Sequence, residues 1–318
     1  MSADTRNLKK ILDAKHKSSY MGAMNKLPTA KRAQILAMLC EGSSMRSISR
    51  ICDVSINTVS KILEDAGAVC MAFHDATVQG VKAKRVQVDE IWSFTYAKQK
   101  NVGTAKAAPE RAGDTWTWTA LDADSKLIVQ WYVGDRDGET AKYFINDLAS
   151  RLANRVQLTS DGLKAYLEAV EGAFGADVDY AQLVKLYGAS PESAKGRYSP
   201  AECTGAIKMP VEGKPDPKHI STSHVERQNL TMRMHMRRFT RLTNGFSKKF
   251  ESHVNMVALY TVFYNFTKIH KTLRVTPAMA ASITDKLMTM EDIVNLIDAA
   301  SDKPERPKTY KKRKATQP

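Results

Sequence analysis

Residues 86–94 read VQVDEIWSF, a run of apolar and β-favouring residues that contains two adjacent carboxylates. Val86, Val88 and Ile91 predict a strand in the middle of a sheet. Asp89 is hard to explain there as a solvated surface charge, because ionised groups are costly to bury. Neighbouring side chains of a strand point to opposite faces, so we expect only one of Asp89 and Glu90 to face a common site.

Further strands and helices follow this run in a regular order. Residues 97–114 are polar and predict a loop or flap, and two tryptophan-rich apolar runs then predict a hairpin. After the hairpin, helical and strand patterns alternate. This order indicates an α/β fold, a mixed five-stranded sheet with flanking helices. The remaining expected elements are strands at 115–124, 126–136, 156–162 and 178–188 and helices at 139–154 and 163–175.

The second half of the chain predicts a long loop followed by helices. Residues 188–222 contain several prolines and show no clear period, and loops of this length are usually functional or disordered. A helical region is expected at 223–271, with a break near 243–245. Residues 284–318 predict a short helix at 291–300 and a basic tail that is unfolded when free, and residues 1–27 predict a flexible leader.

Residues 28–70 predict a small DNA-binding domain of the helix-turn-helix type. Three short amphipathic helices are expected, at 29–40, from Ser43 or Ser44, and from Ser55 or Asn57 to Gly67, with Gly42 ending the first. In this motif the last helix enters the major groove with its N-terminus leading. The residues expected to face inward are Ile35, Leu36, Leu39, Ile48, Ile51, Val59, Ile62 and Leu63.

The polar residues of the motif are of a size and kind suited to DNA. Arg46 and Arg50 could hold phosphates. A three-helix protein-interaction domain would show the same inward pattern, but the polar leading face and the charge balance favour DNA. The residues expected near the bases are Ser55, Asn57, Thr58 and Lys61.

The chain carries a large excess of positive charge, with 48 Lys+Arg against 34 Asp+Glu in 318 residues and a net charge of +14. Such a field attracts polyanions, most commonly nucleic acid. No run approaches the roughly 18–20 apolar residues that cross a bilayer. We therefore expect a cytoplasmic, nucleoid-associated protein with no membrane partner. The four cysteines lack a CxxC pair, and Cys40, Cys52 and Cys70 predict buried thiols rather than a zinc site.

Three acidic residues stand in distinctive settings: Asp89 in VQVDEIWSF, Asp161 in VQLTSDGLKAY and Glu226 in HVERQNLTMRMHMRRF. Together with the later block YNFTKIHKTLRVTPAMAA, these segments resemble bacterial insertion-sequence transposases of the DDE type. The resemblance implies a ribonuclease-H-like catalytic domain, as in retroviral-type integrases, over residues 84–283. In this domain residues 188–222 would be a long loop insertion, and the helix-turn-helix would be its usual N-terminal companion.

The resemblance implies that Asp89, Asp161 and Glu226 are both the catalytic residues and the metal ligands. They would hold two Mg²⁺ ions, with Mn²⁺ as a substitute, and hard oxygen ligands suit such ions. One ion would activate water or a DNA 3′-hydroxyl, and the other would stabilise the departing 3′-oxygen. Glu90 is the competing ligand. Taken singly, Asp161 could be a turn-forming residue and Glu226 a helix-start residue, and only their joint occurrence favours catalysis.

The helix that carries Glu226 is expected to present two stripes. Arg233 and Arg237 would lie on the face of Glu226 and grip DNA phosphates leading into the site. His224 would cap the helix or contact the scissile phosphate. The apolar stripe would consist of Met232, Met236 and Phe239.

The resemblance implies a transposase that binds the terminal inverted repeats of its element, cleaves the strands and joins their 3′-hydroxyls to target DNA. Its partner is double-stranded DNA, at the element ends and at the target. Because the two ends are processed together, a homodimer or higher oligomer on DNA is implied. A catalytically silent DNA-binding protein, such as a domesticated regulator, is the alternative; a structure-specific nuclease without strand transfer is a third.

Overall fold

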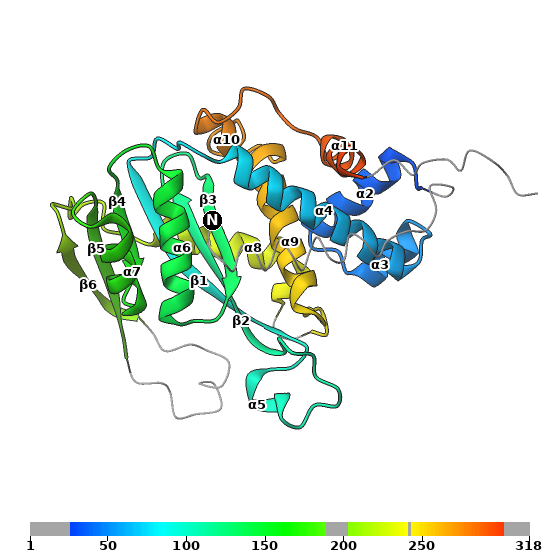
Figure 1. Ribbon diagram of the computed structural model, residues 1–318, viewed down its shortest axis with the longest axis horizontal. Coiled ribbons are helices and arrows are strands. Elements are labelled where there is room, and N and C mark those ends of the chain that lie inside the picture. The colour runs from blue at the N-terminus through cyan, green and yellow to red at the C-terminus, as the bar shows by residue number, and fades with distance from the viewer. Residues whose placement is uncertain (1–25, 189–202, 241–242, 302–318) are drawn as a thin grey trace, which may run out of the picture.

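The computed structural model describes residues 26–188, 203–240 and 243–301, and its centre is a six-stranded mixed sheet (Figure 1). The strands are β1 (Arg85–Thr95), β2 (Gly113–Asp122), β3 (Ile128–Gly134), β4 (Gln157–Asp161), β5 (Asp179–Tyr187) and β6 (Cys203–Glu212). Their spatial order is β3-β2-β1-β4-β5-β6. β1 pairs antiparallel with β2 and parallel with β4, which is itself parallel to β5. The predicted mixed sheet is confirmed, with one strand more than expected.

The unequal lengths of β1 and β4 create an opening in the sheet. The two strands run in parallel with Gln87 opposite Thr159, so Asp89 and Asp161 come to the same level two residues further on. β4 ends at Asp161, whereas β1 continues to Thr95. Beyond Asp161, β1 therefore has no neighbour from β4, and side chains from both faces of the sheet can meet around this strand end.

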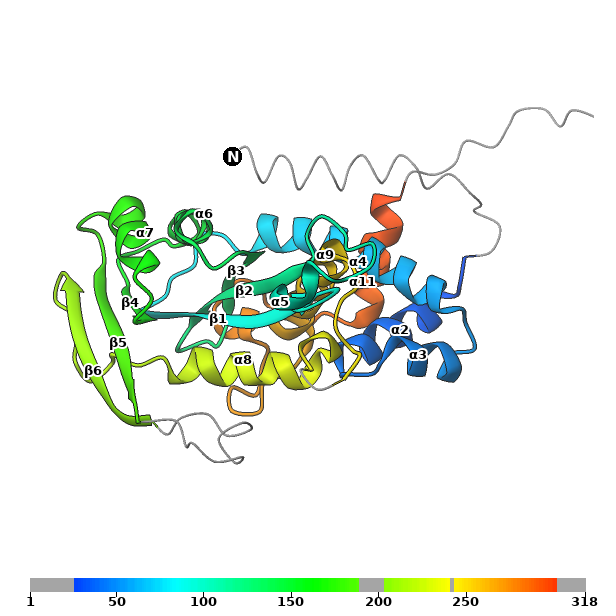
Figure 2. The ribbon, with the colours of Figure 1, turned by 90° about the horizontal axis from the view of Figure 1, so that it is seen from below.

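Helices cover both faces of the sheet (Figure 2). One face carries α6 (Gly138–Arg151) and α7 (Ala165–Phe174), and the opposite face carries α8 (Ser223–His235). α6 begins where Asp137 accepts a hydrogen bond from the Thr140 backbone, as an N-cap residue does. It buries Phe144, Ile145 and Leu148 at helical spacing, so the apolar stripe faces the sheet.

The prediction of a loop throughout 188–222 is wrong in part, because β6 lies within it and pairs antiparallel with β5. Almost every side chain of β6 is exposed, so this edge strand lacks the contrast between a buried and an exposed face that marks a strand in a sequence. Pro210 also argues against a strand, although edge strands tolerate proline. The remaining residues of the predicted loop that precede β6, 189–202, lie outside the described residues, as do 1–25 of the leader and 302–318 of the tail.

Three helices occupy the region of the predicted helix-turn-helix: α2 (Thr29–Cys40), α3 (Met45–Ile51) and α4 (Ile56–Thr77). α2 ends before Gly42, which has a φ of 80°. Ser44 and Ser55 are the N-caps of the next two helices. Every residue expected to face inward is buried except Ile51, which is 63% exposed at the end of α3.

The end predicted for the third helix, Gly67, is wrong: α4 continues to Thr77. Gly67 is buried inside the helix against α9 (Phe250–Val262), and a Cβ placed on it would lie only 2.4 Å from the Cβ of Asn255. The glycine therefore permits close approach of two helices rather than a helix end. A local pattern cannot distinguish these two uses of glycine.

The break predicted near 243–245 in the helical region 223–271 begins earlier than expected. α8 stops at His235 because Met236 takes an extended conformation, with φ −111° and ψ 109°. A short 3-10 turn, η2 (Arg237–Phe239), follows, and the chain becomes helical again at Phe250. Met232, Met236 and Phe239 are all buried as expected, but only Met232 lies on α8, so they do not form one stripe on the helix.

The helices of both chain ends belong to one hydrophobic core with the sheet. Its buried residues run from Ala33 to Ile297. The predicted helix at 291–300 is α11 (Met290–Ala300), and it packs on α2 and α4. Arg32 forms a double hydrogen bond with Asp298 at 2.7 Å across this contact. Between α9 and α11 the chain forms a π-helical turn, η3 (Phe263–Thr267), and the short α10 (Pro277–Ala280). None of the helices in the described ranges is both long and apolar enough to span a membrane.

Candidate metal and nucleic-acid site

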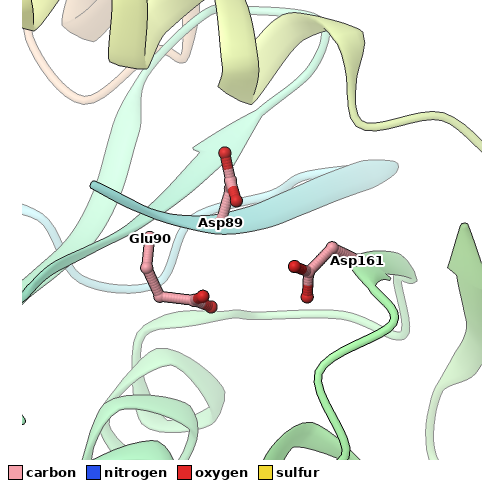
Figure 3. Close-up of side chains that lie close together, drawn as sticks. All are labelled: Asp89, Glu90 and Asp161. Atoms are coloured by element: carbon pink, nitrogen blue, oxygen red, sulfur yellow. The ribbon is translucent and has the colours of Figure 1, made fainter. Parts of the chain in front are cut away.

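Three carboxylates converge where β4 ends beside β1 (Figure 3). Asp89, Glu90 and Asp161 each offer an oxygen, and these oxygens lie within 4.8 Å of one another. Such a spacing would suit a cation shared by oxygen ligands. The expectation that only one of Asp89 and Glu90 can face the site is wrong. They do leave β1 on opposite sides, but Asp161 is the last residue of β4, and its carboxylate lies close to both of theirs.

Asp89 is held by a contact on the face of the sheet that α8 covers. Its Oδ2 accepts a hydrogen bond from Asn229 of α8 at 2.8 Å. Burial raises the pKa of Asp89 to about 6, and the negative charge of Asp161 adds to this effect. The ionised pair of carboxylates is therefore under electrostatic strain that a bound cation would relieve.

Glu90 lies on the other side of the sheet and is buried. Burial, followed by repulsion from Asp161, raises its pKa to about 7. Its Oε2 accepts a hydrogen bond from Arg136 at 3.1 Å. Its Oε1 is buried without a partner in good hydrogen-bonding geometry, although the Tyr166 hydroxyl lies close enough to favour the ionised form. The charge of Glu90 thus adds to the negative potential of Asp89 and Asp161, which a divalent cation bound by those two residues would relieve.

Glu226 lines the same cleft from α8, but its carboxylate makes contacts outside the acidic cluster. Its Oε1 pairs with Lys185 of β5 at 2.5 Å and accepts a hydrogen bond from the Thr222 hydroxyl. The charge of Glu226 still contributes to raising the pKa of Asp89. The three residues of the expected triad thus lie in one cleft, with Asp89 and Asp161 adjacent and Glu226 neutralised by a lysine.

The cleft has a volume of about 840 Å³ and contains charges of both signs. Arg136 lies 3.7 Å from Asp161 and stacks over the ring of Trp116, with 4.9 Å from the guanidinium carbon to the ring centroid. Mixed charge of this kind suits a ligand that brings both cations and anions, such as a metal-bound phosphodiester. The charged residues that line it are Asp89, Glu90, Arg136, Asp161, Lys164, Lys185, Glu226 and Arg233.

The two arginines expected to form a stripe below Glu226 are separated in the structure. Arg233 lies on α8 and lines the cleft. Arg237 follows the end of the helix, in η2, and is exposed. Because the helix stops at His235, the seven-residue spacing that would align Arg237 with Glu226 and Arg233 is not maintained.

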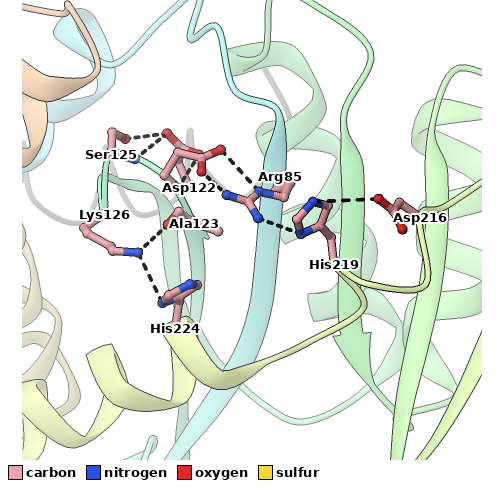
Figure 4. A network of polar contacts seen from close by, with 9 residues as sticks. Arg85, Asp122, Ala123, Ser125, Lys126, Asp216, His219 and His224 are labelled. Carbon is pink, nitrogen blue, oxygen red and sulfur yellow. Dashed lines mark hydrogen bonds and ion pairs between the residues drawn. The ribbon is translucent and has the colours of Figure 1, made fainter.

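His224 does not cap α8, and its contact with the scissile phosphate stays a prediction. The N-cap of α8 is Thr222, and the His224 ring lies beside Lys126, 3.2 Å from Nδ1 to Nζ (Figure 4). Burial lowers the pKa of His224, and Lys126 lowers it further. The same network contains Arg85, which pairs with Asp124 and with His219. Arg85, Asp124 and His219 line a second cleft of about 1280 Å³, which contains none of the expected triad.

The residues expected to contact DNA in the N-terminal helices are mostly exposed. Arg46, Arg50, Ser55, Asn57 and Lys61 are exposed, and Thr58 is half-buried. The Ser55 side chain accepts the hydrogen bond of the Thr58 backbone, so it is occupied as a helix cap. Lys61 lies 3.4 Å from Asp65 one turn later on α4.

Three residues of the cleft that contact its carboxylates had no place in the sequence-based site: Arg136, Lys185 and Asn229. Arg136 follows the strand β3 by two residues, and Asn229 lies one turn after Glu226 on α8. The helical spacing of Asn229 from Glu226 was a usable signal. The positions of Lys185 and Arg136 depend on which strands become neighbours, and no local pattern carries that information.

No protein-family model matches the chain, and no curated protein matches it either. Among solved structures, it is similar to a piggyBac transposase in a synaptic complex with hairpin DNA, at 8% identity over 92% of this chain and 76% of that one, with a TM-score of 0.37. It is also similar to the Mos1 mariner transposase in a paired-end complex with Mn, at 12% identity over 92% and 87% of the two chains, with a TM-score of 0.30. At these identities and TM-scores, neither protein transfers its activity to this chain.

Proposed function

We propose that the chain is a DDE-type DNA transposase that cleaves strands at the ends of an insertion sequence and joins them to target DNA. The observation that carries this proposal is the meeting of Asp89, Asp161 and Glu226, from two strands and a helix, in one cleft. The net charge of +14 and the exposed polar residues of α3 and α4 support DNA as the substrate. In a bacterial host such an enzyme acts at the nucleoid.

The metal would be held by Asp89, Asp161 and Glu226, with Mg²⁺ as the expected ion and Mn²⁺ as its substitute. When bound, two such ions would activate the attacking oxygen and stabilise the leaving one. The chain's own residues supply position: Asn229 orients Asp89, and the Asp161 Oδ1 accepts the Leu163 backbone hydrogen bond at 2.9 Å. We assign Glu90 as the anchor of Arg136, which would face the non-bridging oxygens of the phosphodiester.

DNA recognition is proposed for α3 and α4, within residues 28–70. The exposed side chain of Asn57 lies in the first turn of α4, where a recognition helix reads bases, and Arg46 and Arg50 would hold phosphates. Arg233 and Arg237 would contact the DNA nearer the cleft. Processing of two ends requires two active sites, so a homodimer or larger assembly on DNA is proposed.

The test is a Mg²⁺-dependent cleavage and strand-transfer assay on DNA of the element ends, with DNA binding measured in parallel. Asp89→Asn, Asp161→Asn and Glu226→Gln should bind DNA as wild type does and lose both reactions. Asp177→Asn is a matched control, because this exposed aspartate pairs with Arg155 away from the cleft. Loss of one reaction step with Asp177→Asn, or retained cleavage in the Asp89 variant, would contradict the proposal.

A catalytically silent DNA-binding protein is the second candidate. The observation that favours it is the ion pair between Glu226 and Lys185, which neutralises one member of the triad with an ammonium group. In that case wild type would bind the end DNA without cleaving it in Mg²⁺ or Mn²⁺.

A further inference from the structure

Lys185 occupies a defined place in the cleft because of the strand register. β5 lies parallel to β4 with Leu183 opposite Asp161, so Lys185 is two residues beyond the aspartate and on the same face as Leu183. This face is the one that α8 covers, and the ammonium meets Glu226 there. The pairing of β5 with β4 thus places the Lys185 ammonium beside the acidic cluster.

The contact between Lys185 and Glu226 leaves part of the carboxylate available. Both of its partners, Lys185 and Thr222, contact the same oxygen, Oε1. Within the described ranges, Oε2 has no hydrogen-bond partner. The two side chains are 30% and 38% exposed, so solvent screens the pair and a divalent cation could compete with the ammonium.

We propose that Lys185 is a positioning residue that holds Glu226 while the metal is absent and moves to a DNA phosphate when metal and DNA enter the cleft. This inference rests on the proposed function. A lysine suits such an exchange, because its ammonium is a point charge on a flexible stem and needs no fixed geometry. A displaced ammonium would remain in the cleft with Asp89 and Asp161, next to the expected path of the phosphodiester.

If the ion pair had only a structural role, its removal would have a different effect. Its loss would change the stability of the fold and leave the affinity for metal ions unchanged or weaker. Competition makes the opposite prediction, since removal of the ammonium leaves Glu226 available to the cation. Affinity for the metal itself therefore separates the two roles, without any measurement of activity.

The experiment is a Mn²⁺ titration of the full chain in the absence of DNA, with free Mn²⁺ followed by electron paramagnetic resonance. Lys185→Met should bind Mn²⁺ about two- to fivefold more tightly than wild type, the range expected for a half-exposed ion pair. Lys142→Met is the matched control: Lys142 forms a 2.6 Å pair with Glu168 between α6 and α7, outside the cleft. It should leave Mn²⁺ affinity at the wild-type value. Lys185→Arg keeps a positive charge that competes with the metal ion for Glu226, so its Mn²⁺ affinity should stay near the wild-type value.

The second measurement uses pre-cleaved end DNA that lacks the 3′-hydroxyl, in Mn²⁺, over a range of salt concentrations. Lys185→Met should weaken DNA binding and reduce the slope of log K against log salt by about one. Unchanged or weaker Mn²⁺ affinity in Lys185→Met overturns the inference, and so does an unchanged salt slope. If Asp89→Asn and Asp161→Asn bind Mn²⁺ as tightly as wild type does, the proposed metal site itself is wrong, and this outcome is distinguishable from the first two.

Discussion

The guanidinium of Arg136 donates a hydrogen bond to Oε2 of the buried Glu90 at 3.1 Å. The same arginine lies 3.7 Å from Asp161 and packs over Trp116, so an acidic residue, a candidate metal ligand and an aromatic ring all fix its place. Arg136 is thus a cation in direct contact with the acidic cluster. Its hydrogen bond to Glu90 fixes the guanidinium beside Asp161.

Because Glu90 anchors Arg136 and Asp89 is a proposed ligand, Glu90→Gln and Asp89→Asn should have different effects on cleavage and on metal affinity. Glu90→Gln removes the charged anchor of Arg136 but keeps a hydrogen-bond acceptor, so we expect cleavage to slow by about tenfold with Mn²⁺ affinity near the wild-type value. Asp89→Asn removes a proposed ligand and should lower both the cleavage rate and the Mn²⁺ affinity. Rates and Mn²⁺ titrations on the two variants check this. An equal loss of metal affinity in both would make Glu90 a ligand.

A divalent cation should stabilise the fold through the acidic cluster. Burial and repulsion from Asp161 raise the pKa values of Asp89 and Glu90, so negative charge in the cluster is unfavourable until a cation binds. At a Mn²⁺ concentration of about 100 times the dissociation constant, binding adds about 2.7 kcal/mol, or about 5 °C in Tm. Asp161→Asn should remove most of this shift and leave the metal-free protein at least as stable as wild type, because it removes a repelling charge. Calorimetry with and without Mn²⁺ would show a persistent shift in the variant if the ion binds elsewhere.

Acid should destabilise the fold through buried His74. Burial, together with the positive charge of Arg151, lowers its pKa to about 3, whereas an imidazole in the unfolded chain titrates near 6.5. The unfolded state therefore takes up a proton first, and stability present above pH 6.5 is lost as the pH falls toward 3. At pH 5 the loss is about 2 kcal/mol.

His74→Leu should remove this part of the pH dependence. The Ile128 carbonyl that His74 contacts also accepts a hydrogen bond from Asn265, so it keeps a partner in the variant. Urea unfolding at pH 5 and pH 7 should give a difference in free energy about 2 kcal/mol smaller for His74→Leu than for wild type. His219→Gln, a change at a half-exposed histidine, serves as the control, and an equal effect there would rule out burial as the cause.

Gly67→Ala should destabilise the contact of α4 with α9. The new Cβ would lie 2.4 Å from the Cβ of Asn255, so the helices must separate, at a cost of about 2 kcal/mol or more. Gly172→Ala in α7 is the matched control, since nothing lies within 4 Å of the place that its Cβ would take, and helix propensity alone should stabilise it by about 0.5–1 kcal/mol. Chemical denaturation of both variants tests the opposite signs.

Asn57→Ala should weaken binding to the specific end sequence more than binding to random DNA. If Asn57 reads a base, its loss costs about 1–3 kcal/mol of discrimination with little change in salt dependence. Arg50→Ala, which removes a phosphate contact, should weaken binding to both sequences alike and reduce the salt slope by about one. Competition binding at several salt concentrations checks both, and equal behaviour of the two variants would argue against base reading at Asn57.

The order of most strands and helices, and most of the inward-facing residues, could be predicted from the amino-acid sequence alone. Val86, Val88 and Ile91 in β1, and Ile35, Leu36 and Leu39 in α2, are buried as their spacing predicts, because apolar periodicity reports which side of an element faces away from water. The cleft residues Asp89, Asp161 and Glu226 could also be selected from the sequence, since each stands in a distinctive segment of a strand or helix.

The contacts that these residues make depend on how the elements pack in three dimensions. Gly67 became a contact point because α9 lies against α4, and α8 ended at His235 because Met236 and Phe239 turn into the core. Glu90 joined Asp89 at one cluster because β4 is shorter than β1. The partners Arg136 and Lys185 come from segments distant along the chain, and contacts of this kind depend on strand order and register, which local patterns do not encode.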